Sequence, residues 1–331
     1  MGYLEIATAG IIWAATGPLV RKLGEAGFTA LDIVLGRAVF AVAFMGAWLL
    51  LQGWRRREAG RPSPDDLDQD EPTRRWQQGP LFPEPQDIPV FLALGFLAVV
   101  LSQTTYFYAL SKTSVAVAVT LNYTAPFFVM VISRFLYKEP LTAPKSAALA
   151  GAIVGVGLTS GFLGPGSGRL NMSVPGVLAG LLSGLAYGSQ TIVYKRVGTK
   201  YGPVPLNFWT MALGAADLSI LLALFTGRPP LVFAKMAAAP PHAWALLLLI
   251  GMGPGTAAFL LFADGINKVE ATSGSIVAMC EPVAACLLSY FILGEKLTGL
   301  QVAGIFMVLA GIWTVSAVDA HRRKARRSLA T

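Results

Sequence analysis

The chain has 331 residues, of which 54% are hydrophobic and 13% charged, and its net charge is +8. A soluble domain carries about 25% charged residues, so this composition excludes an ordinary soluble domain and favours a chain that lies mostly in a bilayer. The positive charges fall in loops and the C-terminal tail, which indicates membrane orientation and argues against nucleic acid as a partner.

Apolar segments of spanning length follow one another along the whole chain and predict an all-α integral membrane protein with ten transmembrane helices. The expected spans are 3–23, 30–53, 88–110, 114–136, 143–163, 173–195, 204–226, 243–264, 271–293 and 299–318.

One long connection, 54–86, interrupts this pattern with prolines, an acidic cluster and flanking arginines. Such a composition predicts a polar linker that does not pack against the helices. If both termini are inside, most of the 26 Lys and Arg residues fall in inside segments. The positive-inside rule therefore predicts a multi-pass protein of the cytoplasmic (inner) membrane with both termini cytoplasmic.

A doubled segment divides the chain into halves. Residues 125–142 contain Ala-Pro, an apolar run and Glu139-Pro-Leu-Thr, and residues 281–298 contain Glu-Pro, an apolar run and Glu295-Lys-Leu-Thr. We therefore expect spans 1–5 to repeat as spans 6–10, in units 1–168 and 169–318 followed by a basic cytoplasmic tail, 319–331. Five is odd, so the repeats would be inverted, with Glu139 near the cytoplasm and Glu295 near the outside.

Two five-span repeats whose fourth spans end in Glu-x-Leu-Thr resemble the drug/metabolite transporter superfamily, in particular its EamA-like family. The aromatic and basic ends of spans 1 and 6 (13–22 and 187–196) and the sequence Tyr108-Ala109-Leu110 in span 3 add to the resemblance. It implies two inverted five-helix repeats around a central cavity. It also implies export or exchange of small metabolites such as amino acids, or of amphipathic drugs.

Glu281 is the sharpest candidate for a functional residue, because it lies about halfway along span 9. A carboxylate at that depth should face a cavity or a partner, where it could bind a cation or couple transport to protons. The alternative is a neutral acid that hydrogen-bonds a neighbouring helix. Its counterpart in the first half is Ala125, so the acid is not shared by both halves.

Two further charges lie within spans: Arg37 in span 2 and Asp217 in span 7. One of them could find a partner across the interface between the halves. We expect instead that Arg37 extends outward to the membrane interface and that Asp217 is neutral.

Prolines are expected to break three helices. Pro126 and Pro282 occupy matched positions in spans 4 and 9, as paired interruptions at a transporter site do. Pro254 lies in a Gly-rich stretch that should kink span 8, whereas span 3 has only Gly95 at the matching place, so this kink should be asymmetric.

Polar and aromatic side chains at membrane depth complete the expected substrate site, although Trp13 and Tyr187 could instead belong to an interfacial aromatic belt. The predicted substrate-binding residues are Trp13, Gln103, Tyr106, Asn122, Tyr123, Tyr187, Gln190, Thr256 and Glu281. Glycines at every fourth position from 176 to 188, and at 151 and 155, predict close helix packing.

The sequence contains no phosphate-binding loop, Gly-x-Ser-x-Gly elbow or His-Glu-x-x-His pair, so neither an enzyme nor a cofactor or metal is expected. The preferred function is a secondary transporter working by alternating access, with the bilayer and a small-molecule substrate as partners. Transport would be driven either by proton exchange at Glu281 or by the solute gradient alone. The alternatives are a non-transporting sensor that binds a partner through 54–86, or an intramembrane lipid-handling enzyme. The sequence does not determine the substrate, the direction of transport or the oligomeric state.

Overall fold

Helices are the only regular elements in the part of the chain that the computed structural model describes, residues 1–58, 80–163, 173–226, 232–293 and 296–328. The first half contains α1 (Gly2–Ala14), α2 (Thr16–Glu25), α3 (Ala30–Glu58), η2 (Pro85–Asp87), α5 (Ile88–Gly95), η3 (Phe96–Gln103), α6 (Thr104–Lys112), α7 (Val115–Asn122), α8 (Ala125–Leu136) and α9 (Ala143–Thr159). The second half contains α10 (Val174–Val197), α11 (Pro203–Thr226), α12 (Val232–Ala238), α13 (Pro241–Met252), η5 (Gly253–Ala257), α14 (Ala258–Lys268), α15 (Ala271–Ala278), α16 (Cys280–Leu293) and α17 (Gly299–Ser328).

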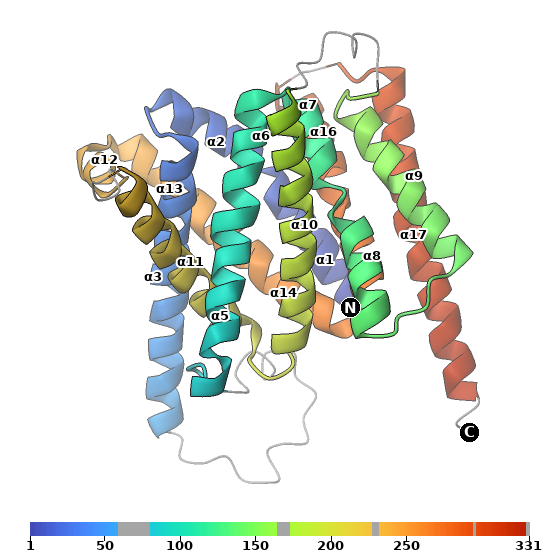
Figure 1. The fold of residues 1–331 in the computed structure, drawn as a ribbon, viewed down its shortest axis with the longest axis horizontal. Coiled ribbons are helices and arrows are strands. Elements are labelled where there is room, and N and C mark those ends of the chain that lie inside the picture. Colours follow the sequence, from blue (N-terminus) through green and yellow to red (C-terminus); the bar gives the residue numbers. More distant parts are fainter. Residues whose placement is uncertain (59–79, 164–172, 227–231, 294–295, 329–331) are drawn as a thin grey trace.

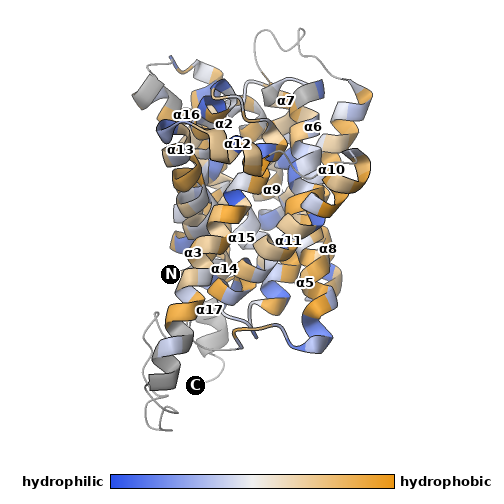
Figure 2. Ribbon diagram, turned by 90° about the vertical axis from the view of Figure 1, so that its left-hand side faces the viewer, coloured by the Kyte–Doolittle hydropathy of each residue, from blue (hydrophilic) through white to orange (hydrophobic). Residues whose placement is uncertain are grey.

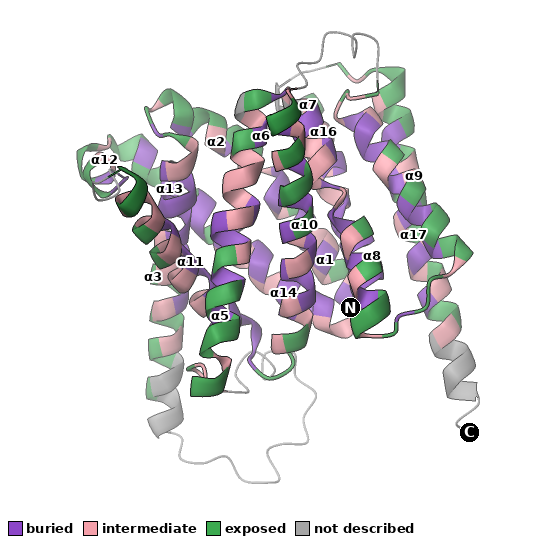
Figure 3. Cartoon of the chain, viewed as in Figure 1, coloured by how far each residue is buried: buried purple, intermediate pink, exposed green. Residues whose placement is uncertain are grey.

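The outer surface of the bundle is apolar, as a bilayer requires. Among the described residues, 9 helical segments are long and apolar enough to cross a membrane, and α9 is a shorter apolar helix. Large side chains such as Phe135, Phe225 and Trp313 are 77%, 85% and 73% exposed, which water would disfavour but lipid accepts. Hydrophobic residues dominate the helices (Figure 2), and the buried residues lie on their inward sides (Figure 3). The predicted all-helical membrane fold is confirmed.

The contacts that a helix of one half makes with the other half recur with the two halves exchanged. Helix α1 packs on α14, α15 and α16, and α10 packs on the corresponding α6, α7 and α8. Helix α3 packs on α13, and α11 packs on α5. The pairs α3–α11 and α9–α17 each join equivalent helices, and α9 and α17 lie side by side at one edge of Figure 1. This pattern is consistent with an inverted repeat.

The helix breaks are more symmetric than expected. Span 4 divides between α7 and α8, with Pro126 in the first turn of α8, and span 9 divides between α15 and α16 near Pro282. Span 8 contains the π-helical segment η5 with Pro254, and span 3 contains the π-helical segment η3. The expected asymmetry is therefore wrong, because a π-helical turn does not require a proline. Span 1 has a break at Ala15 that no sequence signal predicted.

The last part of the 54–86 linker packs against the bundle, contrary to prediction. The Trp209 indole donates to the Leu81 carbonyl at 3.0 Å, and the Glu84 amide donates to the Tyr201 hydroxyl at 2.9 Å. Two polar anchors on the α10–α11 region thus hold the approach to α5. Residues 59–79, the expected boundary between the halves at 164–172, and Glu295 lie outside the described residues.

Close helix approach depends on the glycines at most of the expected positions. A Cβ on Gly180 would lie 2.8 Å from Leu121, and one on Gly188 would lie 2.9 Å from the Ala125 carbonyl, so the α10 stripe faces span 4. On α9, a Cβ on Gly155 would lie 2.8 Å from the Gly304 carbonyl of α17. Gly151 has nothing within 4 Å, so its expected packing role is wrong.

Buried ion pairs close one end of the bundle, which we call the terminal end because the start of α1 and the last turns of α17 meet there. Lys145 on α9 is 1% exposed and pairs with Asp319 on α17 at 2.7 Å and with Glu270 at the start of α15. Asp319 also accepts a hydrogen bond from Tyr3 at 2.5 Å. We call Lys145, Glu270, Asp319 and Tyr3 the ion-pair layer.

Glu139, a buried residue beside this layer, joins span 4 to span 9. Its carboxylate accepts the backbone N–H groups of Ala271 at 2.8 Å and Thr272 at 3.2 Å, and it lies 3.4 Å from the Lys195 ammonium. Burial raises the pKa of this carboxyl, but Lys195 and the bonds to the N-terminus of α15 outweigh it and hold the pKa below its ordinary value.

The Gly155 contact predicts a strong position effect on α9. Gly155→Leu should separate α9 from α17 and reduce stability by about 3 kcal/mol, the upper range for overpacking. Gly151→Leu, one helical turn away, should leave stability near wild type. Thermal denaturation in detergent, followed by size-exclusion chromatography, measures both, and equal melting temperatures for the two variants would contradict the packing assignment.

Glu139 predicts a specific dependence of stability on pH. Because folding lowers its pKa, its stabilisation is complete above the unfolded pKa, near 4.5, and is lost as the pH falls through the folded value. Glu139→Gln should therefore cost about 2 kcal/mol at pH 7, and the difference from wild type should shrink below pH 4.5. Melting curves from pH 7 to pH 3 test this. Glu25→Gln, which breaks an ion pair with an exposed carboxylate, is the control and should change little at any pH.

Candidate functional site

Charged and phenolic side chains from five spans lie close enough inside the bundle to interact electrostatically, in what we call the interior cluster. It consists of Arg37, Tyr106, Tyr123, Tyr187, Tyr194 and Glu281. The cluster joins α3, α6 and the α7–α8 turn of the first half to α10 and α16 of the second. It therefore lies where the two halves face each other.

The break in span 9 positions Glu281. Helix α15 ends at Ala278 and α16 begins at Cys280, so Glu281 is in the first turn of the new helix. Its carboxylate lies near enough to Tyr123, Tyr106 and Tyr187 to interact electrostatically with all three phenols. Glu281 remains partly accessible, so a solute or proton that enters the cluster can reach it.

Arg37 points into the bundle, so its expected extension to the membrane interface is wrong. The residue is 7% exposed, and its guanidinium carbon lies 6.0 Å from the centre of the Phe259 ring. Its side chain passes over the π-helical segment η5, where a Cβ on Gly255 would lie 2.9 Å from Arg37 Cγ. The missing side chain at Gly255 is the reason an arginine fits inside. Arg37 interacts electrostatically with Glu281 and Tyr194 rather than with Asp217.

Trp13 supports this arrangement without touching the charges. Its indole donates to the Pro254 carbonyl at 3.0 Å, and its rings pack against Phe259 at 5.0 Å and Phe262 at 5.4 Å. The Trp13 bond satisfies a carbonyl within η5 and fixes span 1 to span 8. Trp13 is thus a buried interior residue and not part of an interfacial belt.

The other predicted residues divide into near and distant groups. Gln190 is 3% exposed and lies beside Tyr194 in the interior. Asn122 accepts a hydrogen bond from Ser183 at 3.1 Å and so joins span 4 to span 6. The Thr256 hydroxyl donates to the Gly251 carbonyl of its own helix, and Gln103 is half-buried at the end of η3. No described contact brings Gln103 or Thr256 to Glu281.

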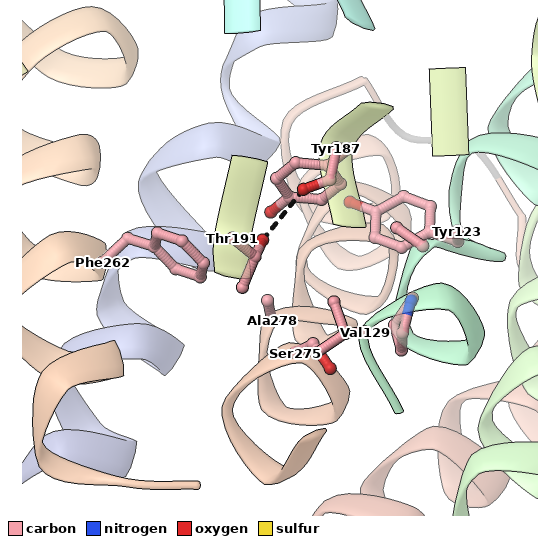
Figure 4. Close-up of a pocket in the computed structure, with 9 residues that line it drawn as sticks. Tyr123, Val129, Tyr187, Thr191, Phe262, Ser275 and Ala278 are labelled. Atoms are coloured by element: carbon pink, nitrogen blue, oxygen red, sulfur yellow. Dashed lines mark hydrogen bonds between the residues drawn. The ribbon is translucent and has the colours of Figure 1, made fainter. Parts of the chain in front are cut away.

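A narrow cavity lies beside Tyr123 and Tyr187 of the cluster (Figure 4). Tyr123 and Tyr187 lie on one side of it and Ser275 and Ala278 on another, and Pro126 also lines it. Its volume is about 10 Å³, which is close to the space that one water molecule needs. A solute larger than water would therefore require the halves to separate here.

Asp217 is not part of the cluster. Its Oδ2 atom is buried and has no hydrogen-bond partner in the described structure. The structure thus keeps the two intramembrane acids apart, with Glu281 among phenols and Asp217 alone on α11.

Sequence reasoning missed one member of the cluster, Tyr194, and its hydrogen-bond partner, Asn207. The Tyr194 hydroxyl donates to Asn207 at 2.7 Å, and Asn207 in turn donates to the Phe259 carbonyl at 3.2 Å. Both residues are 0% exposed. An Asn within span 7 was the available signal, because a buried amide in a membrane needs partners.

Similar proteins are transporters by name. The chain is 31% identical over 212 residues to an uncharacterized transporter of Archaeoglobus fulgidus, covering 64% of this chain and 71% of the relative. It is 24% identical over 281 residues to the uncharacterized transporter YxxF of Bacillus subtilis, covering 85% of this chain and 79% of the relative. These names indicate a transporter rather than an enzyme.

The fold has a solved counterpart. One crystal structure matches with a TM-score of 0.72 over 96% of this chain and 98% of the other, at 18% sequence identity, which shows the fold alone. The model of the EamA-like transporter family matches twice, at residues 1–161 and 174–317, once in each half of the bundle. The chain is therefore a multi-pass membrane protein that belongs to the EamA-like transporter family.

Proposed function

We propose that the protein is a secondary transporter that exports small organic solutes, such as amino acids or amphipathic drugs, through the interior cluster. The observation that carries this proposal is the placement of Glu281 and Arg37 inside the bundle, between the halves and away from lipid. A charge at membrane depth costs free energy, and such charges are therefore rare and generally mark a functional site. The surrounding phenols offer apolar faces and hydroxyl groups, which suit a solute that is partly apolar.

The exchange of equivalent helix contacts between the halves supports an alternating-access mechanism, in which rocking one repeat against the other would expose the same site to each side in turn. The ends of the bundle are chemically different. Lys145, Glu270 and Asp319 at the terminal end correspond by repeat position to Gln301, Ser114 and Leu163 at the opposite end. We propose that the ion-pair layer is the gate of the terminal end, and that this end faces the cytoplasm of a cytoplasmic membrane, with both chain termini there.

Glu281 is the proposed site of proton coupling, so its neutral variant should separate coupled from uncoupled transport. Glu281→Gln in proteoliposomes should abolish solute accumulation driven by an imposed pH gradient while retaining downhill exchange. A panel of radiolabelled amino acids, nucleosides and cationic drugs supplies the solutes. Asp217→Asn, at the other intramembrane acid, is the control and should retain coupling. Unchanged pH-driven accumulation by Glu281→Gln would refute coupling through this residue.

The ion pairs of Lys145 should keep the gate at the terminal end closed at rest. Lys145→Met leaves Asp319 and Glu270 without their buried cation, which should favour separation of the terminal end. In a background with Cys280→Ser and Cys286→Ser, Ser275→Cys places a thiol in the cavity. An impermeant maleimide added from the terminal side should label this thiol at least tenfold faster when Lys145 is replaced.

Lys235→Met is the matched control for this gate, since Lys235 pairs with Asp32 near α12, outside the ion-pair layer. It should leave labelling from the terminal side unchanged. Equal labelling rates in wild type and Lys145→Met would show that the ion-pair layer does not hold the gate.

A further inference from the structure

Arg37 is a buried cation without a hydrogen-bond acceptor. Its Nε is buried and unpartnered, and none of its guanidinium N–H groups donates to an acceptor in the described structure. A guanidinium carries five N–H donors, and burying such a charge without acceptors costs free energy. Arg37 is only 7% exposed, so its guanidinium donors are buried and are free to bind an acceptor that enters the bundle.

The neighbours of Arg37 do not use this capacity. Glu281 attracts it, but the two do not form an ion pair within 4.0 Å in the described structure. The Tyr194 hydroxyl donates its hydrogen bond to Asn207. The Phe259 ring, 6.0 Å away, offers only a weak cation–π contact.

A second unused donor comes from the opposite half. The Nε2 of Gln190 is buried and has no hydrogen bond of normal geometry, although Tyr194 lies beside it. Gln190 lies beside Tyr194, and Arg37 interacts electrostatically with the same phenol, so the two donors share a neighbour. Donors without acceptors, one from each half, are what an anion between the halves would satisfy.

We propose that Arg37 and Gln190 form an anion subsite that binds the carboxylate group of the transported solute. The planar guanidinium fork matches the two oxygens of a carboxylate, and the Gln190 amide adds a neutral donor. This inference rests on the proposed transport function for its consequence, but the binding itself can be tested without transport.

Matched probe pairs test the subsite in the purified full-length protein. Small carboxylates from acetate to 3-phenylpropionate are each compared with their primary amides by thermal shift. At least one acid should raise the melting temperature by several degrees, and its amide should not. Arg37→Gln should weaken binding of that acid at least tenfold, whereas Arg37→Lys should weaken it less, because a charge remains without the fork.

Arg21→Gln is the matched control, since Arg21 is an exposed arginine on α2, and it should bind the acid as wild type does. If no acid stabilises wild type more than its amide, or if Arg37→Gln responds as wild type does, the anion subsite is wrong.

Ligand-free stability separates a binding residue from a structural one. In the Glu281→Gln background, where no attraction to Glu281 remains, Arg37→Met should raise the melting temperature, because it removes a buried charge that lacks acceptors. A lower melting temperature would mean that Arg37 stabilises the bundle, and would overturn the proposal.

Transport distinguishes failure of this inference from failure of the proposed function. If the acid binds through Arg37 but no solute crosses the membrane, the anion subsite stands and the transport function fails. If solutes are transported equally by wild type and Arg37→Gln, with acid and amide alike, the transport function stands and the anion subsite fails.

Discussion

A charge inside a bilayer needs an enclosed polar surrounding, and the interior of this bundle is arranged around that constraint. Glu281 lies just after the break between α15 and α16, and the Arg37 side chain packs against the backbone of Gly255. Trp13 ties the π-helical segment η5 in place through the Pro254 carbonyl. The placement of the charges therefore depends on the helix breaks, because a regular helix with a side chain at Gly255 would exclude the arginine.

Buried charges also distinguish the two ends of the molecule. At the terminal end, Lys145, Glu270 and Asp319 form buried ion pairs, while Glu139 holds the start of α15. The matching positions at the opposite end are Gln, Ser and Leu. A repeat that is symmetric in its backbone contacts is thus asymmetric in its electrostatics. Because only the terminal end is held by these ion pairs, the two ends of the bundle should differ in the free energy needed to open them.

Much of the fold could be predicted from residue patterns, and the errors have identifiable causes. Spans follow from apolar length, so the expected limits agree with the helices to within a few residues at most ends. Tyr106, Tyr123 and Tyr187 were expected near Glu281, and all three interact with it electrostatically. The direction of Arg37 was wrong, since sequence depth suggests the nearest interface, whereas the accommodating glycine lies on a different helix more than 200 residues away.

The sequence by itself determined the membrane class, the order of the spans, the internal duplication and the candidate acid at mid-span. These depend on local composition and spacing, which a chain carries before it folds. Only the tertiary structure decided which glycines touch a neighbour, that Arg37 faces inward without an acceptor, and that Asp217 is isolated from Glu281. Those properties depend on which helices pack together and how each is rotated. In lipid, backbone and side-chain contacts between distant segments set that rotation.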